Sequence, residues 1–389
     1  MNAVDAARSG LRWTVVQLIP RLSPGGAERS TMETARALVA AGHRSIVVSG
    51  GGRWVPRLKA EGSEHIQLPI GSKSLGAIWT VLRLRWLLQR LRPDLVHARS
   101  RLPAWLLKLA LLGSGLRVAQ VNTVHGLNSV SRYSRILTRA DRVIAVSQTT
   151  RNYLLANYPG IDDSRLRIVP PGADPLEFPS GTRCSEEWLE ALHYEFPALA
   201  GGLLMTLPGR GTRLKGHAEA IRLLAKVREQ GVDARLLLLG VVEESRRDYV
   251  RELQALARQL GMDEYVAFST PRGDVRDVYA ASALVLQLST RPESFGRVVA
   301  EALCLGRPVL GYDHGGVGDL LRELYPAGCS PLGDLDALTE RALLLLREAP
   351  EVDTARVPKV SDSQALTLSV YSELLDGTAP HPAALARSS

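Results

Sequence analysis

Two glutamates eight residues apart, Glu293 and Glu301, flank the predicted start of a helix in the second half of the chain. At a rise of about 1.5 Å per residue, this spacing separates them by roughly 12 Å. The backbone N–H groups of Ser294, Phe295 and Gly296 lie at the helix N-terminus, where they lack intrahelical partners and attract phosphate. The arrangement suits a ligand with hydroxyl groups at both ends and an anionic middle, which is the shape of a nucleotide sugar. Taken alone, two glutamates at this spacing are more simply explained as surface charges.

A second group of charged residues follows the predicted strand Leu203–Leu207, in the glycine-rich stretch PGRGTRLKGH. Here Arg210 offers paired donors to a phosphate, and Lys215 offers a point charge. Together these two cations can neutralise a departing diphosphate, and Arg213 is the weakest candidate of the three. Basic residues in a loop are often only solvated, so this assignment depends on what surrounds the loop.

In the first half, the loop that holds Gly25 and Gly26 follows a predicted strand and therefore faces a ligand site at the carboxyl ends of the strands. Glycines let the backbone approach a ligand closely. The loop lacks the G-x-G-x-x-G spacing of a dinucleotide site, and a simple tight turn is the alternative explanation. In the sequence TVHGLN, His125 also follows a strand end and is a candidate for ligand contact, whereas His97 is a weaker one.

The elements that position these residues alternate between strand and helix. In the first half, the predicted strands are Thr14–Ile19, Ser45–Ser49, Leu95–Ala98, Val118–Val124, Val143–Val146 and Leu166–Val169, and the helix after the first strand is Ala27–Ala41. In the second half, the strands are Leu203–Leu207, Ala234–Leu239, Val266–Ser269, Leu284–Leu288 and Val309–Tyr312, with helices at Gly216–Glu229, Ser245–Leu260 and Phe295–Leu305. This α/β alternation predicts two doubly wound parallel sheets, each forming a Rossmann-like domain.

The segment around the two glutamates resembles the signature of glycosyltransferase family 4. In order, it contains Glu293, Phe295–Gly296, Glu301 and Gly315–Gly316. One departure is Asp319, where the family more often has Glu. The Gly-Gly-Ala-Glu-Arg loop, the strand-His-Gly pattern and the Gly-Arg…Lys-Gly pattern are similar to further features of this family. The resemblance implies a GT-B fold, in which two Rossmann-like domains face each other and a C-terminal helix crosses back to the first domain, and a retaining glycosyltransferase of hexosyltransferase type.

The resemblance also implies roles for individual residues. The catalytic set is Arg210, Lys215, Glu293 and His125, and the donor-binding set is Gly25, Gly26, Ser294, Phe295, Gly296 and Glu301. In these roles His125 contacts the donor sugar, Glu293 binds its hydroxyl groups and Glu301 binds the ribose. No carboxylate is obviously placed as a covalent nucleophile, so the resemblance implies attack on the face from which the phosphate departs, with a phosphate oxygen accepting the proton.

The length of 389 residues suits two domains, and the proline-dense segment Pro170–Pro179 suits neither a helix nor an inner strand. We therefore predict an N-terminal acceptor-binding domain at residues 1–178, a C-terminal nucleotide-sugar-binding domain at 179–362, a crossover helix at 363–376 and a disordered tail at 377–389. The boundary resembles the hinge of the family, although Pro171 stands where the family usually has Asn.

Several functions are excluded or disfavoured by composition. No Asp-x-Asp pair ends a strand, and Asp334-Leu335-Asp336 is better explained as a helix N-cap, so we expect a metal-independent enzyme without a cofactor beside its nucleotide-sugar donor. The three cysteines show neither pairing nor metal spacing. The N-terminal stretch lacks the apolar core of a signal peptide, and no run approaches the roughly 18 apolar residues of a membrane span, which predicts a cytoplasmic protein.

Charge is distributed unevenly. Residues 1–180 carry 25 Lys and Arg against 11 Asp and Glu, a formal charge of +14, whereas the whole chain carries +8. The stretches Leu75–Arg92 and Arg99–Lys108 place Trp79 and Trp86 among leucines and arginines, a pattern typical of helices at anionic membranes, although such leucines can instead face a core. We expect peripheral binding at the inner face of the cytoplasmic membrane and a saccharide or lipid-linked acceptor, as in lipopolysaccharide or polysaccharide synthesis. Nucleic acid is excluded as a partner for want of any motif.

Two other functions remain open. A nucleotide-sugar epimerase shares the same fold plan but needs neither an acceptor surface nor a basic first domain. A non-catalytic nucleotide-sugar-binding protein is disfavoured because Arg210, Lys215, Glu293 and Glu301 are all present. The base and sugar of the donor do not follow from the sequence.

Overall fold

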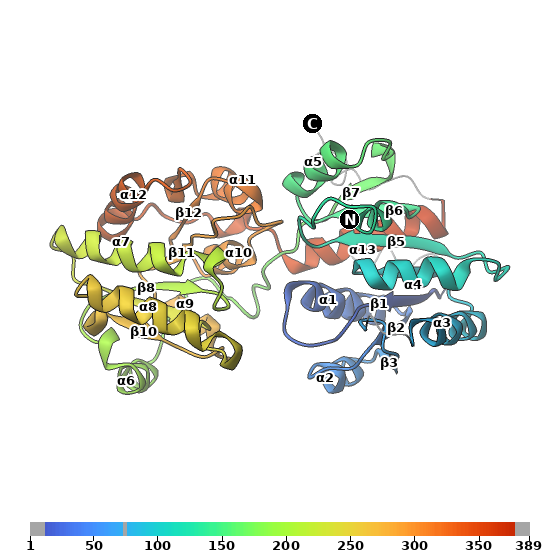
Figure 1. The fold of residues 1–389 in the computed structure, drawn as a ribbon, viewed down its shortest axis with the longest axis horizontal. Coiled ribbons are helices and arrows are strands. Elements are labelled where there is room, and N and C mark those ends of the chain that lie inside the picture. Colours follow the sequence, from blue (N-terminus) through green and yellow to red (C-terminus); the bar gives the residue numbers. More distant parts are fainter. Residues whose placement is uncertain (1–11, 73–75, 378–389) are drawn as a thin grey trace. The chain divides into compact units, whose positions relative to one another are not determined.

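The structure, a computed structural model, describes residues 12–72 and 76–377. The chain divides into two compact units (Figure 1). Unit 1 comprises Met1–Pro171 with Val360–Ser389, and unit 2 comprises Gly172–Lys359. The first division falls within the proline-dense segment, whereas the sequence analysis placed it after residue 178. The predicted disordered tail lies outside the described residues, apart from Gly377.

Unit 1 is built on a parallel sheet with the strand order β3-β2-β1-β4-β5-β6-β7. The strands are β1 (Thr14–Leu18), β2 (Arg44–Ser49), β3 (Glu64–Gln67), β4 (Leu95–Ala98), β5 (Ala119–Val124), β6 (Arg142–Ala145) and β7 (Leu166–Ile168). All but β3 were predicted. Its sequence EHIQ has only one apolar residue, because β3 is an edge strand whose residues are half-buried or exposed.

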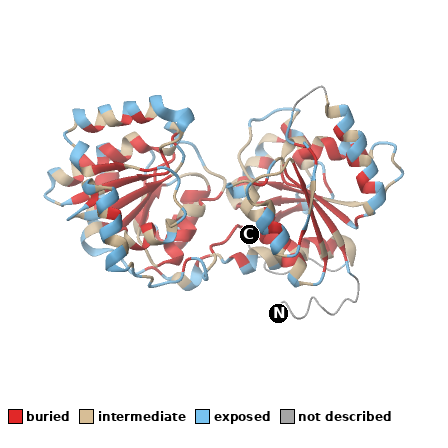
Figure 2. Cartoon of the chain, turned by 90° about the horizontal axis from the view of Figure 1, so that it is seen from below, coloured by how far each residue is buried: buried red, intermediate tan, exposed pale blue. Residues whose placement is uncertain are grey.

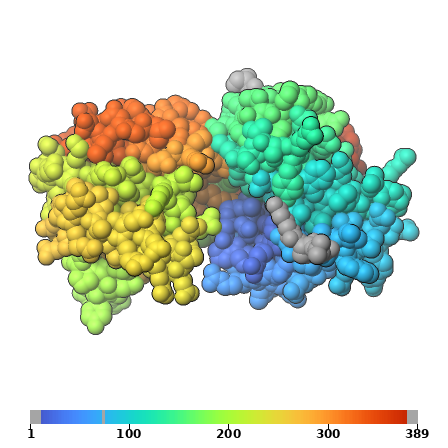
Figure 3. Space-filling view, in the orientation of Figure 1, coloured from blue at the N-terminus to red at the C-terminus, as the bar shows by residue number. Residues whose placement is uncertain are grey.

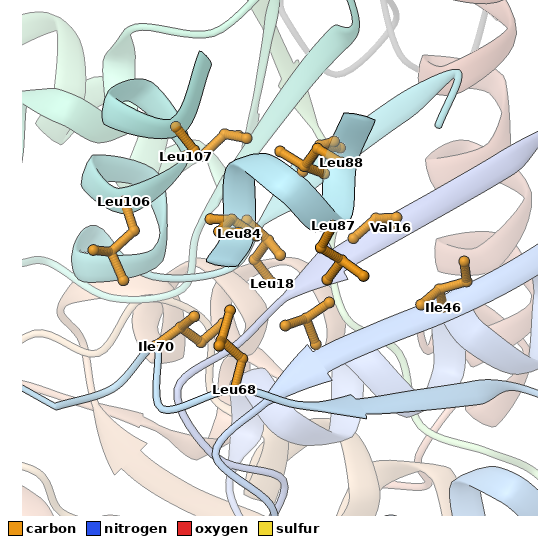
Figure 4. Close-up of a cluster of buried hydrophobic side chains, with 13 residues drawn as sticks. Val16, Leu18, Ile46, Leu68, Ile70, Leu84, Leu87, Leu88, Leu106 and Leu107 are labelled. Carbon is orange, nitrogen blue, oxygen red and sulfur yellow. The ribbon is translucent and has the colours of Figure 1, made fainter. Parts of the chain in front are cut away.

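Helices cover both faces of this sheet. They are α1 (Gly26–Ala40), α2 (Val55–Ala60), α3 (Ala77–Leu91), α4 (Arg101–Leu111), α5 (Gln148–Asn157) and α13 (Val360–Leu375). The strands other than β3 are largely buried and the outer faces of the helices are exposed, as Figure 2 shows. On one face, Leu84 of α3 and Leu107 of α4 pack against Val16 and Ile46 of the sheet (Figure 4). Continuous apolar strands are expected where a parallel sheet is covered on both faces.

Unit 2 has a second parallel sheet with the order β10-β9-β8-β11-β12-β13. Its strands are β8 (Leu203–Pro208), β9 (Ala234–Leu239), β10 (Val266–Phe268), β11 (Leu284–Gln287), β12 (Val309–Tyr312) and β13 (Cys329–Ser330). Its helices are α6 (Glu186–Glu195), α7 (His217–Glu229), α8 (Arg247–Gln259), α9 (Val275–Ala281), α10 (Arg297–Cys304), α11 (Gly315–Leu324) and α12 (Leu335–Glu348). The predicted α/β fold of two Rossmann-like units with parallel sheets is confirmed.

The last helix, α13, belongs to unit 1, as expected of a crossover helix. Its Tyr371 is fully buried, and the tyrosine hydroxyl lies 2.6 Å from Nδ1 of His97 on β4. Its Glu373 carboxylate accepts hydrogen bonds from Arg142 and Arg167, each at 3.0 Å. These buried contacts join the end of the chain to the sheet formed by its beginning.

The strand orders determine where ligands can bind. In unit 1 the first strand, β1, lies between β2 and β4, and in unit 2 the first strand, β8, lies between β9 and β11. Each is a switch point, where successive connections leave in opposite directions and open a crevice beyond the carboxyl ends of the strands. The loops after β1, β4, β8 and β11 therefore carry the residues from which a site is built.

Candidate active site

The loop between β8 and α7 is held against the end of β11. Gly216 has a φ of 78°, and a Cβ there would lie 2.1 Å from the carbonyl oxygen of Leu288, so only glycine fits. The N–H of Thr290 donates to the carbonyl of Leu214 at 2.9 Å. These two contacts bring Lys215 beside the loop that follows β11.

Lys215 and Glu293, which are far apart in the sequence, form an ion pair at this point. The Nζ of Lys215 lies 2.5 Å from Oε1 of Glu293, and the side chains are 30% and 25% exposed. The hydroxyl of Ser289 donates to the same carboxylate oxygen. The carboxylate is therefore fixed from two sides while part of it faces solvent, as a ligand-binding group requires.

The backbone around Glu293 is fixed by the glycine pair after β12. The N–H of Gly316 donates to the carbonyl of Glu293 at 2.8 Å. A Cβ on Gly316 would lie 2.6 Å from the backbone of Phe295, and one on Gly315 would lie 2.8 Å from Pro292. The glycine pair is thus needed for close packing of the two loops.

Sequence reasoning missed two residues of this site. Ser289 is one, and the other is His314, whose Nε2 lies 2.7 Å from the carbonyl oxygen of Ser289. Their positions in the sequence were the available signal, because each stands two residues after the end of a buried strand. Both act by positioning Glu293.

The predicted helix start was wrong by two residues. Helix α10 begins at Arg297, and Gly296, with a φ of 109°, is its N-cap. The amides of Ser294 and Phe295 consequently belong to the turn that precedes the helix rather than to its first turn. Phe295 is buried at 5% exposure and anchors that turn.

Glu301 lies on α10 and is only 8% exposed. The alternative interpretation of both glutamates as surface charges is therefore wrong for this residue. A buried carboxylate is costly unless it is compensated. Its position on the helix that carries the Glu293 turn at its N-terminus is compatible with the predicted contact to a ribose.

The other two basic residues of the loop, Arg210 and Arg213, differ in their contacts. The Arg210 side chain is exposed and takes part in none of the ion pairs found among the described residues. In contrast, Arg213 pairs with Glu252 at 2.7 Å, and its guanidinium lies 5.1 Å from the ring centroid of Tyr249. The lower ranking of Arg213 agrees with this engagement elsewhere.

The remaining predicted residues lie in unit 1. Gly25 is the N-cap of α1, in extended rather than left-handed conformation, and a Cβ there would lie 2.3 Å from the carboxylate of Glu28, which would have to move. A Cβ on Gly26 would meet no atom within 4 Å, so this position does not demand glycine for steric reasons within this unit. His125 follows β5 and lines a cavity of about 280 Å³ together with residues from the loops after β1 and β4. The cavity therefore lies at the switch point of the first sheet.

Two secondary candidates have structural roles. His97 is fully buried between Tyr371 and Thr123, and burial holds its pKa well below its usual range, helped by the charge of Arg99. The side chain of Asp334 accepts from the N–H of Ala337 at 2.9 Å and caps α12, as predicted.

No group of three or more His, Cys, Asp or Glu in the described part of the chain is arranged to hold a metal ion. Metal independence itself stays a prediction.

Two Rossmann-like units, each with a parallel sheet, are the architecture of the GT-B glycosyltransferases. Residues 24–176 match the family model of Glycosyltransferase Family 4, and residues 199–356 match that of Glycosyl transferases group 1. The chain belongs to the GT-B glycosyltransferases of the family 4 type.

Three known proteins are compared with this chain by sequence or by structure. A D-inositol 3-phosphate glycosyltransferase of Nocardia farcinica is 32% identical over 250 residues, which covers 63% of this chain and 52% of the relative, so the match spans about half the length of that protein. A glycosyltransferase of Rickettsia africae has a TM-score of 0.79 at 23% identity, with 94% of this chain and all of the other covered. Anabaena Alr3699/HepE, solved with UDP and glucose, has a TM-score of 0.75 at 21% identity over 93% and 100% of the two chains. At these identities the two structures support the fold alone.

Proposed function

We propose that this protein is a retaining, metal-independent glycosyltransferase that moves a sugar from a nucleotide-sugar donor to a saccharide or lipid-linked saccharide. The pairing of Lys215 with Glu293 carries the proposal. A cation for a diphosphate and a carboxylate for sugar hydroxyls stand side by side, at the carboxyl ends of β8 and β11. The similar Anabaena protein, whose crystal structure holds UDP and glucose, supports a donor of this type.

In the proposed complex, the donor diphosphate lies against Arg210, Lys215 and the amides of the turn before α10. Positive charge and backbone donors gathered at this place stabilise the negative charge of the departing diphosphate. Glu293 accepts hydrogen bonds from the donor sugar, and Glu301 from the ribose. In this complex the phosphate attracts Lys215 and releases its ion pair with Glu293. The Glu293 carboxylate can then accept hydrogen bonds from hydroxyl groups.

The proposed transfer breaks the bond between the anomeric carbon and the diphosphate oxygen and forms a bond from that carbon to an acceptor oxygen. Attack occurs on the face that the diphosphate leaves, so the anomeric configuration is retained. The acceptor proton passes to the departing phosphate oxygen. Arg210 and Lys215 favour this step because negative charge accumulates on the diphosphate.

The acceptor is proposed to be a phosphorylated or lipid-linked saccharide of cell-envelope glycan synthesis. The name of the Nocardia relative specifies a phosphorylated polyol as its acceptor, which supports an anionic acceptor for this chain. The formal charge of +14 on residues 1–180 supports the same conclusion.

We further propose that unit 1 binds an anionic membrane surface through α3. Four large apolar side chains of this helix are exposed: Ile78 (72%), Trp79 (72%), Leu82 (47%) and Trp86 (58%). The opposite side of the helix packs into the core through Leu84, Leu87 and Leu88 (Figure 4). The light-blue surface of this region is visible on unit 1 in Figure 3. Several large apolar side chains exposed on one helix face are typical of an interaction site.

Basic residues accompany this apolar face. Arg83 and Arg90 are exposed on α3, and the guanidinium of Arg90 lies 5.3 Å from the ring centroid of Trp86. Each such residue near an anionic leaflet contributes about 1 kcal/mol. Arg85, which lies in the same predicted stretch Leu75–Arg92, instead donates to the carbonyl oxygens of Ala110 at 3.0 Å and Leu112 at 2.6 Å and caps α4. None of the described helices combines the length and the hydropathy that a bilayer span requires.

Donor binding is tested first by thermal unfolding with UDP, GDP and ADP. One nucleotide should raise the melting temperature of the wild-type protein, because a ligand that binds the native state stabilises it, and the rise should be much smaller in Lys215→Met. The transfer is then tested with the matching nucleotide sugars in excess EDTA, and the linkage is assigned by NMR.

Activity in EDTA and an anomeric configuration matching the donor are expected. An inverted product would refute the retaining mechanism, and a strict requirement for added magnesium or manganese would refute metal independence. Conversion of the donor sugar without any acceptor would indicate an epimerase instead.

A further inference from the structure

Unit 1 contains a second cavity, at the end of its sheet opposite to His125. Its volume is about 480 Å³, and it is lined by Gln120 at the start of β5, Asp141 just before β6 and Arg165 just before β7, among others. These three strands are neighbours in the sheet, so their amino-terminal ends lie together. His125, in contrast, follows the carboxyl end of β5. The second cavity is therefore distinct from the one that His125 lines, and its size suits a small ligand.

Three arginines line this cavity: Arg135, Arg139 and Arg165. Arg135 lies in the short 3₁₀ helix Ser134–Thr138, and Arg139 is the C-cap of that helix. Both residues are exposed, and their side chains take part in none of the hydrogen bonds or ion pairs found among the described residues. Two guanidinium groups from one segment thus border the cavity with all their donors available.

Two aspartates offset the positive charge of the cavity only in part. Asp162 pairs with Arg165 at 3.3 Å, and its carboxylate also accepts from the N–H of Ser164 at 3.0 Å and from its hydroxyl at 2.6 Å. The carboxylate of Asp141 accepts from the N–H of Gln120 at 2.8 Å. These contacts engage the aspartates with Arg165 and with the segments before the strands. The charges of Arg135 and Arg139 remain for an anion.

Tyr158, which lines the same cavity, has a buried hydroxyl without a partner. The residue is 4% exposed, and its hydroxyl forms no hydrogen bond with any described residue. Buried polar groups nearly always have a partner, so an unpartnered hydroxyl at a cavity indicates a bound water or ligand. This observation is independent of the arginines and favours a ligand with oxygen atoms.

From this geometry we propose that the cavity is a further ligand site, which binds a soluble phosphate-bearing molecule against the guanidinium groups of Arg135 and Arg139. Guanidinium groups are well suited to phosphate oxygens because they offer paired donors. Tyr158 can donate to a further oxygen of the same ligand. The ligand is not a substrate of the transfer, because the site lies at the amino-terminal ends of the strands, away from the loops that carry the candidate active-site residues.

A soluble ligand is favoured over a lipid headgroup. None of the large exposed apolar side chains of the described residues lines this cavity, whereas proteins that lie at a membrane interface insert such side chains. The exposed tryptophans of unit 1 belong to α3, which contributes no residue to the cavity.

The site can be located with inorganic phosphate as the probe and phenylglyoxal, which modifies accessible guanidinium groups, as the reagent. In the full wild-type chain, phosphate should protect Arg135 and Arg139 from modification, as measured by mass spectrometry. Arg132 is the matched control, because it is exposed in the same segment but does not line the cavity, and it should react equally with and without phosphate. Chloride at the same ionic strength corrects for screening.

Calorimetry then measures the affinity. Because the candidate donor site also attracts phosphate, the titrations use the Arg210→Met, Lys215→Met background. There, the added changes Arg135→Gln and Arg139→Gln should together weaken phosphate binding at least tenfold relative to Arg132→Gln, equivalent to about 1.4 kcal/mol. In the otherwise wild-type chain, the same two changes should leave the rate of transfer without phosphate unaltered.

The proposal is overturned if phosphate does not protect Arg135 and Arg139, or if their double variant binds phosphate as well as Arg132→Gln does. Binding to vesicles containing phosphatidic acid that requires both arginines, without protection by free phosphate, would replace the soluble ligand with a lipid headgroup.

Discussion

The Nζ of Lys215 lies 2.5 Å from Oε1 of Glu293, although the two residues are 78 positions apart in the chain. One residue follows β8 and the other follows β11, which are neighbouring strands in the sheet. The parallel order therefore joins two motifs that the sequence presents apart. In the absence of a donor, each group compensates the charge of the other.

Replacing either basic residue of the β8 loop should impair transfer. Lys215→Ala or Arg210→Ala should lower the turnover number by roughly a hundredfold or more, because each removes a positive charge that stabilises the departing diphosphate. Initial rates at saturating donor measure the effect. Arg222→Ala, on the exposed side of α7, is the control and should transfer at the wild-type rate. Near-normal rates in both Lys215→Ala and Arg210→Ala would refute the assignment.

Glu301→Ala should act on binding rather than on chemistry. The ribose contact is made equally in the ground state and the transition state, so its loss should raise the donor Kd while turnover at saturation changes little. Calorimetric titration with the nucleotide sugar measures the Kd. The exposed Glu340 of α12 provides the control Glu340→Ala, and a donor Kd unchanged in both variants would remove Glu301 from the site.

Binding to lipid vesicles should depend on the exposed tryptophans of α3. The double variant Trp79→Ser, Trp86→Ser should sediment less with vesicles containing anionic lipid at low salt, because both rings are exposed on one helix face and would enter the interface. Higher salt should release the wild type, since charges beyond about 8 to 10 Å are screened.

Tyr194→Ser offers a matched control for this experiment, since Tyr194 is 90% exposed on α6 of unit 2. It should sediment like the wild type. Equal binding of the wild type to neutral and anionic vesicles would contradict the electrostatic part of the proposal. No binding to either would favour a soluble acceptor.

Acid should destabilise unit 2 through His217. This histidine is fully buried at the first position of α7, next to the hydroxyl of Tyr249, and burial lowers its pKa to about 4. The unfolded chain, with a pKa near 6.5, binds the proton more readily, so stability is lost as the pH falls from about 6.5 to about 4. The full loss is about 3 kcal/mol.

Urea unfolding at several pH values tests this expectation. Between pH 7 and pH 4.5, the free energy of unfolding should fall more steeply for the wild type than for His217→Asn, whose side chain does not titrate. Parallel pH dependences would show that the pKa of His217 is not lowered. The comparison cancels the contribution of the carboxylates, which both proteins share.

Most of the fold could be predicted because parallel strands buried on both faces form continuous apolar runs. The strands Leu95–Ala98, Ala234–Leu239 and Val309–Tyr312 have the predicted bounds. The edge strands β3 and β13 could not be found in this way, because β3 is polar and half-exposed and β13 has only two residues. The other two edge strands, β7 and β10, are mostly apolar and mostly buried, and they were predicted.

The site could be predicted only as far as its residues carry a motif. Lys215 and Glu293 were identified, but their contact follows from strand order, which the sequence does not state. Ser289 and His314 were missed because one acts through a hydroxyl and the other through a contact with a backbone carbonyl. Arg85 stands among exposed basic residues in the sequence, but its side chain donates to carbonyls at the end of a different helix, a contact that the sequence does not indicate.

The packing of α13 on unit 1 has a consequence for synthesis on the ribosome. Val370 and Tyr371 complete a hydrophobic cluster with Trp13, Val15 and Leu38, which are among the first described residues to be translated. A nascent chain that has emerged only as far as Lys359 holds all of unit 2 but lacks this helix. The unit translated first must therefore await the synthesis of α13 to close its core, while the unit translated second can complete its folding earlier.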